Sequence, residues 1–225
     1  MDSQLQHKVS HEWILADLLA TKDLLVLFLK VNKAKEAHLT ALRKTPSVLF
    51  EVNGTSLAGG LIVQLVDEAR RGRGFAYAPY SHFNVGAAIL AENSVGERKV
   101  FVGCNIENAA YGSTICAERT ATFKAVSEGF RKFHAYAVVG GFDMHVSKVL
   151  RANTQKTYIT PCGSCRQVTN EFEANPCVVI MAKDTDEIYI TTLEYLLPSG
   201  FGPKALGVDA SSYDGGYAHK LKHKK

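Results

Sequence analysis

Two short segments of the chain contain residues that can bind and use a metal ion. Residues 116–119 read Cys-Ala-Glu-Arg, and residues 161–165 read Pro-Cys-Gly-Ser-Cys. Both segments precede predicted helices, and the partial positive charge of a helix N-terminus stabilises thiolate, the form that binds zinc. A Cys-x-x-Cys turn lets Cys162 and Cys165 reach one ion, and Cys116 supplies a third ligand. Three ligands leave one tetrahedral position of zinc for water, which indicates a catalytic site.

Glu118 lies two residues from Cys116, so its carboxylate is expected to reach that water without binding the metal. The same residues have other interpretations. Cys104 could join the three cysteines in a closed structural zinc site. Cys162 and Cys165 alone could form a thioredoxin-like redox pair, which would leave Glu118 unexplained. A glutamate at a helix start is also an ordinary feature, because the helix dipole favours it there.

Alternating strands and helices are predicted to position these residues. Valine, alanine and isoleucine alternate within the first strand, and glycines at 72 and 74 end the helix before it. The predicted helices cover 61–69, 116–128 and 165–172, and the predicted strands cover 83–90, 99–103, 135–140, 178–181 and 188–191. The first two strands form a hairpin across a polar loop. A hairpin followed by alternating elements predicts a mixed sheet with helices on both faces.

The first 55 residues are predicted to form an extension without a chemical motif. Residues 13–42 are rich in Leu, Ala and Lys, which predicts a helix that ends before Pro46. We expect this helix to pack on the main domain or on a partner subunit. Its buried face would contain Trp13, Leu18, Leu19, Leu25, Phe28 and Leu29.

Composition and charge favour a globular protein and give no indication of a nucleic-acid partner. The chain has 225 residues, of which 46% are hydrophobic, and a net charge of +4. Four lysines lie in residues 219–225, and the remaining chain balances 22 basic with 22 acidic residues. A neutral body does not favour nucleic-acid binding. The basic end is expected to be a solvated, flexible tail.

Cysteine usage points to a reducing, cytoplasmic location. The five cysteines are odd in number, and the N-terminus shows no secretory signal pattern. Cys104 and Cys177 are therefore predicted to be buried thiols. No membrane span is expected, because the apolar run 24–29 is far shorter than the roughly 20 residues that a spanning helix needs.

The order of the motifs resembles the homotetrameric cytidine deaminases from about residue 76 to residue 203. The zinc-site pattern itself, with a Pro-Cys-x-x-Cys turn and a glutamate that is not a ligand, is typical of zinc deaminases. The matching blocks are 80–83 with 85–88, 103–109, 116–119, 125–129, 161–167, and 196–198 with 201–203. Two features depart from the compact family pattern: the extension before residue 56 and a longer stretch over 143–156.

The resemblance assigns an expected role to individual residues. Cys116, Cys162 and Cys165 resemble the zinc ligands, and Glu118 resembles the proton shuttle. Arg119 is expected to donate hydrogen bonds to ligand sulfur, which offsets the charge of three thiolates. The substrate contacts implied are the Phe83 ring against the base, Asn105 and Glu107 on the ribose 3′-hydroxyl, the Ala117 backbone at the polar edge of the base, and Phe201 supplied to a neighbouring subunit.

The resemblance implies hydrolysis of the 4-amino group of free cytidine and 2′-deoxycytidine, in pyrimidine salvage, by a zinc-bound hydroxide. It further implies one Zn²⁺ per chain and a homotetramer with composite active sites, with no nucleic-acid or membrane partner. Two alternatives remain: an enzyme of the same fold acting on a nucleoside antibiotic or a polynucleotide cytosine, and a non-catalytic zinc protein. Glu118 opposes the second, while Asn105, Glu107 and the neutral body oppose a polynucleotide substrate.

The expected fold class is therefore α/β: a three-layer α/β/α cytidine-deaminase-like fold with a mixed central sheet of about five strands, preceded by a mostly helical extension. Three regions are expected: the extension over 1–55, the zinc deaminase domain over 56–207 and the basic tail over 208–225.

Overall fold

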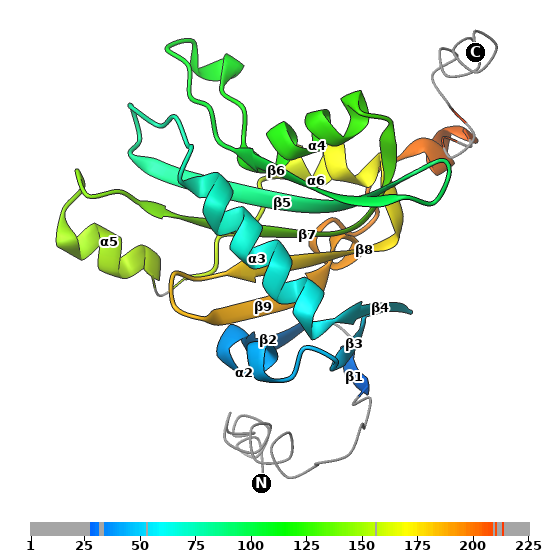
Figure 1. Cartoon of the computed structure of the whole chain (residues 1–225). Helices are drawn as coiled ribbons and strands as arrows, with labels where there is room; N and C mark the ends of the chain where they lie inside the picture. Colours follow the sequence, from blue (N-terminus) through cyan, green and yellow to red (C-terminus); the bar gives the residue numbers. More distant parts are fainter. Residues whose placement is uncertain are drawn as a thin grey trace, which may run out of the picture.

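A mixed sheet of six strands forms the centre of the chain (Figure 1). The structure is a computed structural model that describes residues 28–31, 34–52, 54–155, 157–208, 210 and 213. Strands β7 and β8 pair in parallel, and the other neighbouring strands pair antiparallel. In spatial order the strands are β2 (Ala34–His38), β9 (Glu187–Thr192), β8 (Glu173–Ala182), β7 (Phe130–Phe142), β5 (Phe83–Asn93) and β6 (Arg98–Cys104).

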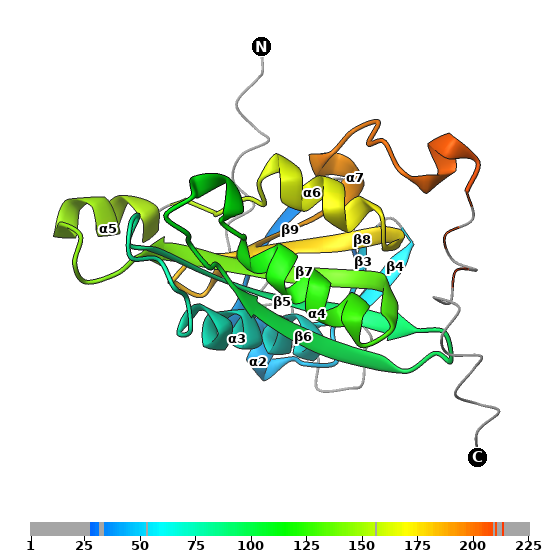
Figure 2. The ribbon, with the colours of Figure 1, turned by 90° about the horizontal axis from the view of Figure 1, so that it is seen from above.

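Helices cover both faces of this sheet. Helix α3 (Gly59–Arg73) lies on one face, and α4 (Ala117–Ser127) and α6 (Gly163–Asn170) lie on the other (Figures 1 and 2). Successive residues of a strand point to opposite faces. Accordingly, Ala135 and Ala137 of β7 belong to the buried cluster under α3, whereas Tyr136 and Val138 belong to the cluster under α4. The three-layer α/β/α fold is thereby confirmed.

Two glycines allow the helices to approach the sheet closely. A Cβ atom on Gly86 of β5 would lie 2.0 Å from the Ala69 carbonyl oxygen of α3. A Cβ atom on Gly103 of β6 would lie 2.4 Å from the Ala117 carbonyl oxygen and 2.5 Å from the Ala121 nitrogen. Only glycine leaves room for such backbone contacts. Gly103 therefore determines how near the first turn of α4 lies to the sheet.

The prediction of a helix over 13–42 is wrong for residues 28–31 and 34–38, which form strands. Strands β1 (Phe28–Val31) and β2 occupy this range, and the helix α2 (Leu39–Lys44) begins only at Leu39. The β2 sequence AKEAH favours a helix in isolation, but its backbone pairs with β9 from Ala34↔Thr191 to His38↔Glu187. Pairing at a sheet edge overrides helix propensity, which is a weak preference. This pairing also makes the sheet six-stranded rather than five-stranded.

Most of the predicted buried face of the extension lies outside the described residues. Trp13, Leu18, Leu19 and Leu25 are among residues 1–27, and the side chains of Phe28 and Leu29 are likewise outside the description.

A second, three-stranded sheet connects the N-terminal segment to α3. It consists of β1, β3 (Leu49–Val52) and β4 (Thr55–Ala58), with β3 in the middle. Phe50, Val52 and Leu57 are almost completely buried and share one apolar cluster with Ile62 and Leu65 of α3. The segment before residue 59 therefore contributes directly to the core on this face.

The remaining predicted elements are confirmed. The 83–90 and 99–103 strands are β5 and β6, paired as an antiparallel hairpin, and the helices at 116 and 165 are α4 and α6. The longer stretch over 143–156 contains α5 (Lys148–Gln155). A short 3₁₀ turn, Tyr111–Ser113, lies between β6 and α4, whereas α7 (Leu193–Leu196) and a second 3₁₀ turn, Pro203–Leu206, follow β9. Within the described residues, no helix combines the length and apolar character needed to cross a membrane.

Candidate metal centre and active site

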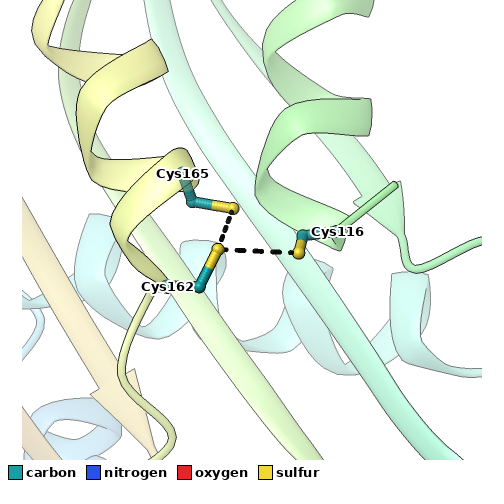
Figure 3. Close-up of side chains that lie close together, drawn as sticks. All are labelled: Cys116, Cys162 and Cys165. Carbon is teal, nitrogen blue, oxygen red and sulfur yellow. Dashed lines mark hydrogen bonds between the residues drawn. The ribbon is translucent and has the colours of Figure 1, made fainter. Parts of the chain in front are cut away.

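The N-termini of α4 and α6 bring three cysteines together (Figure 3). Cys116 is the N-cap of α4, Cys162 is the N-cap of α6, and Cys165 lies in the first turn of α6. The Sγ atoms of Cys116 and Cys162 are 3.8 Å apart, and those of Cys162 and Cys165 are 3.4 Å apart. All three sulfur atoms lie within 4.8 Å of one another.

These separations fit a zinc ion. Two sulfurs at about 2.3 Å from a tetrahedral zinc are separated by about 3.8 Å. The observed distances of 3.8 and 3.4 Å are close to this value. Thiolates are soft ligands that favour zinc over magnesium or calcium. Three sulfurs leave the fourth position for a non-protein ligand.

The surroundings of Cys116 favour its thiolate form. The pKa of Cys116 is lowered to about 5, first because Cys165 hydrogen-bonds to its thiolate and further because Arg119 does so. The pKa of Cys165 is raised, first because it donates its proton to Cys116 and also because of burial. The opposite shifts describe one shared proton between the two sulfurs. A metal cation replaces that proton, so that the cluster is suited to bind one.

Arg119 lies against the cluster on the α4 side. Its Nη2 atom is 3.1 Å from the Thr114 carbonyl oxygen and 3.7 Å from the Cys116 sulfur. The carbonyl fixes the guanidinium, which then presents positive charge to the sulfur. The pKa of Arg119 is raised, chiefly by the hydrogen bond to Cys116.

Glu118 occupies the first turn of α4, beside the cysteines. Only 4% of the residue is exposed. Its pKa is raised to about 7, first by burial and also by the negative charge of Cys116, although the helix backbone acts in the opposite direction. A carboxyl group that titrates near neutral pH both accepts and donates protons efficiently.

The other two cysteines lie apart from the cluster. Cys177 is fully buried in the core under α4, as predicted. Cys104 ends β6, and its Sγ atom donates to the Phe75 carbonyl oxygen at 3.3 Å. It is half-buried, so the prediction of a buried thiol is wrong at this position. Because the group of metal-binding side chains found in the described residues contains only Cys116, Cys162 and Cys165, the four-cysteine site loses its support.

Asn105 and Glu107 lie beyond β6 and contact the segment before β5. The Glu107 carboxylate accepts hydrogen bonds from the backbone nitrogens of Tyr80 and Ser81 at 2.9 and 3.1 Å, and from the Ser81 hydroxyl. The Asn105 side chain accepts from the Val85 nitrogen and donates to the Phe83 carbonyl, both at 2.8 Å. Each side chain retains hydrogen-bonding capacity: a carboxylate oxygen lone pair and one amide N–H.

The remaining predicted substrate contacts lie in three separate parts of the chain. Phe83 begins β5, and its ring packs edge-on against Phe142 with a centroid distance of 4.9 Å. Ala117 is fully buried at the start of α4. Phe201 is 60% exposed, and its carbonyl accepts from Gln167 and Asn170 of α6 at 2.6 and 3.1 Å. The structure of the single chain thus leaves the Phe201 ring facing outward.

Two contributors to the site were not predicted. The Arg166 guanidinium donates to the Pro161 carbonyl at 2.8 Å and to the Leu196 carbonyl at 2.7 Å, and thereby holds the loop that leads into Cys162. The Ser81 hydroxyl contacts Glu107. Both residues lie in the matching blocks 80–83 and 161–167. The sequence therefore marks their positions, but it does not indicate which groups they contact.

A groove of about 500 Å³ runs beside this region along the outer face of α4. Its lining includes Glu107 but none of the three clustered cysteines: Ile106, Glu107, Asn108, Ser113, Ile115, Thr120, Phe123, Lys124 and Ser127. A second groove, of about 420 Å³, lies between α3 and the β5–β6 hairpin, and its lining contains none of the predicted site residues.

Comparisons with known proteins agree with this geometry. Residues 62–181 match the family described as the cytidine and deoxycytidylate deaminase zinc-binding region. The cytidine deaminase of Sporosarcina psychrophila is 43% identical over 66% of this chain and 97% of that protein. The probable cytidine deaminase of Dictyostelium discoideum is 39% identical over 63% of this chain and 84% of that protein. The crystal structure of cytidine deaminase from Burkholderia pseudomallei covers 61% of this chain and 97% of its own, with 41% identity and a TM-score of 0.51.

A three-layer α/β/α fold that places three cysteines and a buried glutamate at two adjacent helix N-termini, together with these matches, defines a zinc-dependent hydrolytic deaminase. The family follows from the extent of the similarity. The chain belongs to the cytidine deaminase family. Its zinc cofactor is accounted for by the group of Cys116, Cys162 and Cys165.

Proposed function

We propose that the protein hydrolyses free cytidine and 2′-deoxycytidine to uridine and 2′-deoxyuridine, with release of ammonia, as a step of pyrimidine salvage. The observation that carries the proposal is the position of Glu118, a carboxyl group that is only 4% exposed, in the first turn of α4 beside the three-sulfur zinc site. Relatives that are at least 39% identical over most of their own length bear the name cytidine deaminase or probable cytidine deaminase.

Zinc bound by the three cysteines supplies Lewis acidity that brings the pKa of a water molecule to about 7. Glu118 accepts the first proton of that water and passes it to N3 of the base. The water oxygen forms a bond to C4, and Glu118 then carries the second proton to the 4-amino group as the C4–N bond breaks. Ammonia leaves with both electrons of that bond. Burial of Glu118 keeps bulk water from exchanging these protons.

Other residues hold the ligands and substrate for this reaction. Three thiolates leave the zinc site with a net charge of −1, and Arg119, at 3.7 Å from the Cys116 sulfur, offsets it. The Phe83 ring packs against the base, and the Ala117 backbone contacts its polar edge. Each chain binds one zinc ion. The protein works in a reducing compartment, because the cysteine ligands must not be oxidised to disulfides.

Selection of a free nucleoside rests on Asn105 and Glu107. The remaining amide N–H of Asn105 donates to the sugar 3′-hydroxyl, and Glu107 accepts the proton of that hydroxyl. A 3′-phosphodiester has no such proton and places negative charge beside Glu107. A polar site left unpaired in this way rejects an analogue by about 10⁴-fold to 10⁵-fold.

The proposal includes a homotetramer whose active sites are shared between subunits. Supporting it, Phe201 is 60% exposed and lies on a segment fixed by α6, while Tyr111 and Phe123 on the side of Glu107 are 76% and 49% exposed. Light scattering is expected to give four chains per particle. Phe201→Ala is expected to raise KM in assembled protein, and a fully active monomer would contradict the shared site.

The decisive experiment measures ammonia release from cytidine, 2′-deoxycytidine, adenosine and a single-stranded cytosine oligonucleotide. Zinc-loaded protein is expected to use the first two and refuse the others, and zinc-loaded Glu118→Gln protein serves as the inactive control. Release from the oligonucleotide would indicate a polynucleotide deaminase instead. Release from none of the four would refute the proposed substrate.

A further inference from the structure

The Ser81 hydroxyl lies between the two residues assigned to opposite ends of the substrate. It donates to the Glu107 carboxylate and accepts a hydrogen bond from the Phe83 nitrogen at 3.0 Å. Glu107 is the proposed sugar contact and Phe83 the proposed base contact. A single hydroxyl therefore joins both parts of the binding site.

The Glu107 carboxylate depends strongly on this segment. All the hydrogen bonds described for its side chain come from the backbone of Tyr80, the backbone of Ser81 and the Ser81 hydroxyl. Burial acts to raise the pKa of Glu107, but these donors outweigh it and the pKa is lowered. Glu107 is accordingly held as an ionised acceptor with one orientation, which is the form that can accept from a sugar hydroxyl.

The Phe83 backbone is held from two sides. Its nitrogen donates to Ser81, and its carbonyl accepts from the Asn105 amide at 2.8 Å. The intervening His82 has a φ of +55°, an uncommon conformation for a residue with a side chain. Its nitrogen donates to the Ala78 carbonyl and its carbonyl accepts from the Asp143 nitrogen, both at 2.9 Å. Such a conformation persists where the surroundings hold it in place.

Backbone pairing extends the connection between the two segments. The Tyr77 nitrogen donates to the Asn105 carbonyl at 3.0 Å, and the Glu107 nitrogen donates to the Tyr77 carbonyl at 2.8 Å. The segment before β5 and the segment after β6 thus lie side by side (Figure 1). The pairing fixes the backbones, and the Ser81 hydroxyl adds the link between the functional side chain of one segment and the base-binding residue of the other.

We propose that Ser81 is a positioning residue that couples recognition of the sugar 3′-hydroxyl by Glu107 to placement of the base by Phe83. This inference rests on the proposed function, which assigns the sugar contact to Glu107 and the base contact to Phe83. Binding energy from a remote part of a substrate raises the rate when it orients the reacting part. A displacement of about 1 Å at the reacting atoms costs on the order of 100-fold in rate.

The test compares cytidine with 3′-deoxycytidine in wild-type, Ser81→Ala, Ser81→Thr and Ser56→Ala proteins. Ser56→Ala is the matched control, because Ser56 is an exposed serine of β4 in the other sheet. Ser81→Ala is expected to lower kcat/KM for cytidine about 10-fold, the effect of losing a hydrogen bond to a charged group. The ratio of kcat/KM for cytidine over 3′-deoxycytidine falls with it, whereas Ser81→Thr keeps a hydroxyl and restores the ratio.

If Ser81 had a merely structural role, Ser81→Ala would lower kcat/KM for both substrates by the same factor. The ratio of the two kcat/KM values would then stay unchanged, and this result would overturn the proposal. An unchanged ratio in a fully active Ser81→Ala protein would do the same. The double variant Ser81→Ala with Glu107→Gln adds a second criterion. Coupling predicts that it behaves like Glu107→Gln alone, and additive losses would contradict coupling.

A binding measurement separates this proposal from the proposed reaction. Calorimetry on zinc-loaded Glu118→Gln protein gives the affinities for cytidine and 3′-deoxycytidine without turnover. Adding Ser81→Ala is expected to remove about 10-fold of the preference for cytidine, and an intact preference would overturn the role of Ser81. If wild-type protein binds cytidine with this preference but releases no ammonia, the proposed reaction fails while the role of Ser81 in recognition stands.

Discussion

The N-terminal segment 34–58 and the paired helix starts at α4 and α6 are held in place by different forces. The first region packs by apolar burial: Leu39, Phe50 and Leu57 are at most 3% exposed and belong to one cluster with α3. The second region is held by polar contacts around its cysteines, such as Arg119 on Thr114 and Arg166 on Pro161. Burial gives stability with tolerance of side-chain shape, whereas the polar contacts specify the position of particular atoms.

The comparison indicates that stability and chemistry are separated in this molecule. The α3 face of the sheet carries none of the proposed site residues in its buried cluster, and the opposite layer carries the zinc site. A substitution in the first region should therefore change the free energy of unfolding without changing the chemistry of the folded protein. A substitution of Glu118 in the second region should change the chemistry while the protein keeps its fold.

The largest effect is expected from Cys162→Ala. Removing one of three ligands should reduce zinc from one ion per chain to almost none, and activity should disappear with it. Elemental analysis of purified protein measures the zinc content. Cys104→Ala is the control and should keep its zinc, because the Cys104 sulfur contacts the Phe75 carbonyl rather than the cluster. Zinc loss on Cys104→Ala would restore the closed four-cysteine site.

Glu118→Ala is expected to keep zinc and fold but to lose turnover. General acid–base groups contribute about 10²-fold to 10⁴-fold, and a group used in both proton transfers belongs at the upper end. Steady-state kinetics with matched zinc content tests this. Wild-type rates in the zinc-loaded variant would show that Glu118 takes no part in the mechanism. The assignment of the chemistry to the helix starts would then lose its support.

Phe50→Ala is expected to lower the free energy of unfolding by about 3–5 kcal/mol, because a fully buried aromatic side chain leaves a cavity. Phe50 is 1% exposed in β3. Urea denaturation measures the loss, with Ser56→Ala of the neighbouring strand as an exposed control. The kcat of the folded fraction and its zinc content should stay unchanged. A changed kcat would show that the N-terminal segment reaches the chemistry.

The smallest effect is expected from Glu92→Gln, in an ion-pair cluster outside both regions. Glu92 accepts from Arg98 at 2.8 Å and from Lys132 and His134 at 2.9 Å, and these hydrogen bonds, that of Arg98 foremost, lower its pKa to about 2. A lowered carboxyl pKa contributes stability above the unfolded value of about 4.3, and this contribution is lost as the pH falls toward 2.

The wild-type protein should therefore exceed Glu92→Gln in unfolding free energy by on the order of 1 kcal/mol at pH 6. The difference should shrink between pH 5 and pH 2, as followed by urea denaturation at each pH. Zinc loss at low pH affects both proteins equally. It therefore cancels when the unfolding free energy of one protein is subtracted from that of the other. A difference that does not depend on pH would show that the cluster acts through packing rather than charge.

The elements that carry the site were predictable from local patterns. The alternation of Val85, Ala87 and Ile89 predicted β5, and the cysteine-bearing segments predicted the starts of α4 and α6. These signals are local, because strand period, turn residues and helix starts involve neighbours in the sequence. The AKEAH segment was mistaken for a helix, because its strand conformation depends on pairing with β9 about 150 residues away.

The sequence by itself determined the types of ligand that are available: three cysteines at predicted helix starts and a glutamate two residues from one of them are residues suited to a zinc site. Only the tertiary structure decided the distances between the sulfurs, the exclusion of Cys104, the burial that raises the pKa of Glu118, and the contact of Ser81 with Glu107. The physical reason is the range of the interactions. Ligand type is a property of single residues, whereas desolvation and hydrogen-bond geometry arise between segments that only folding brings together.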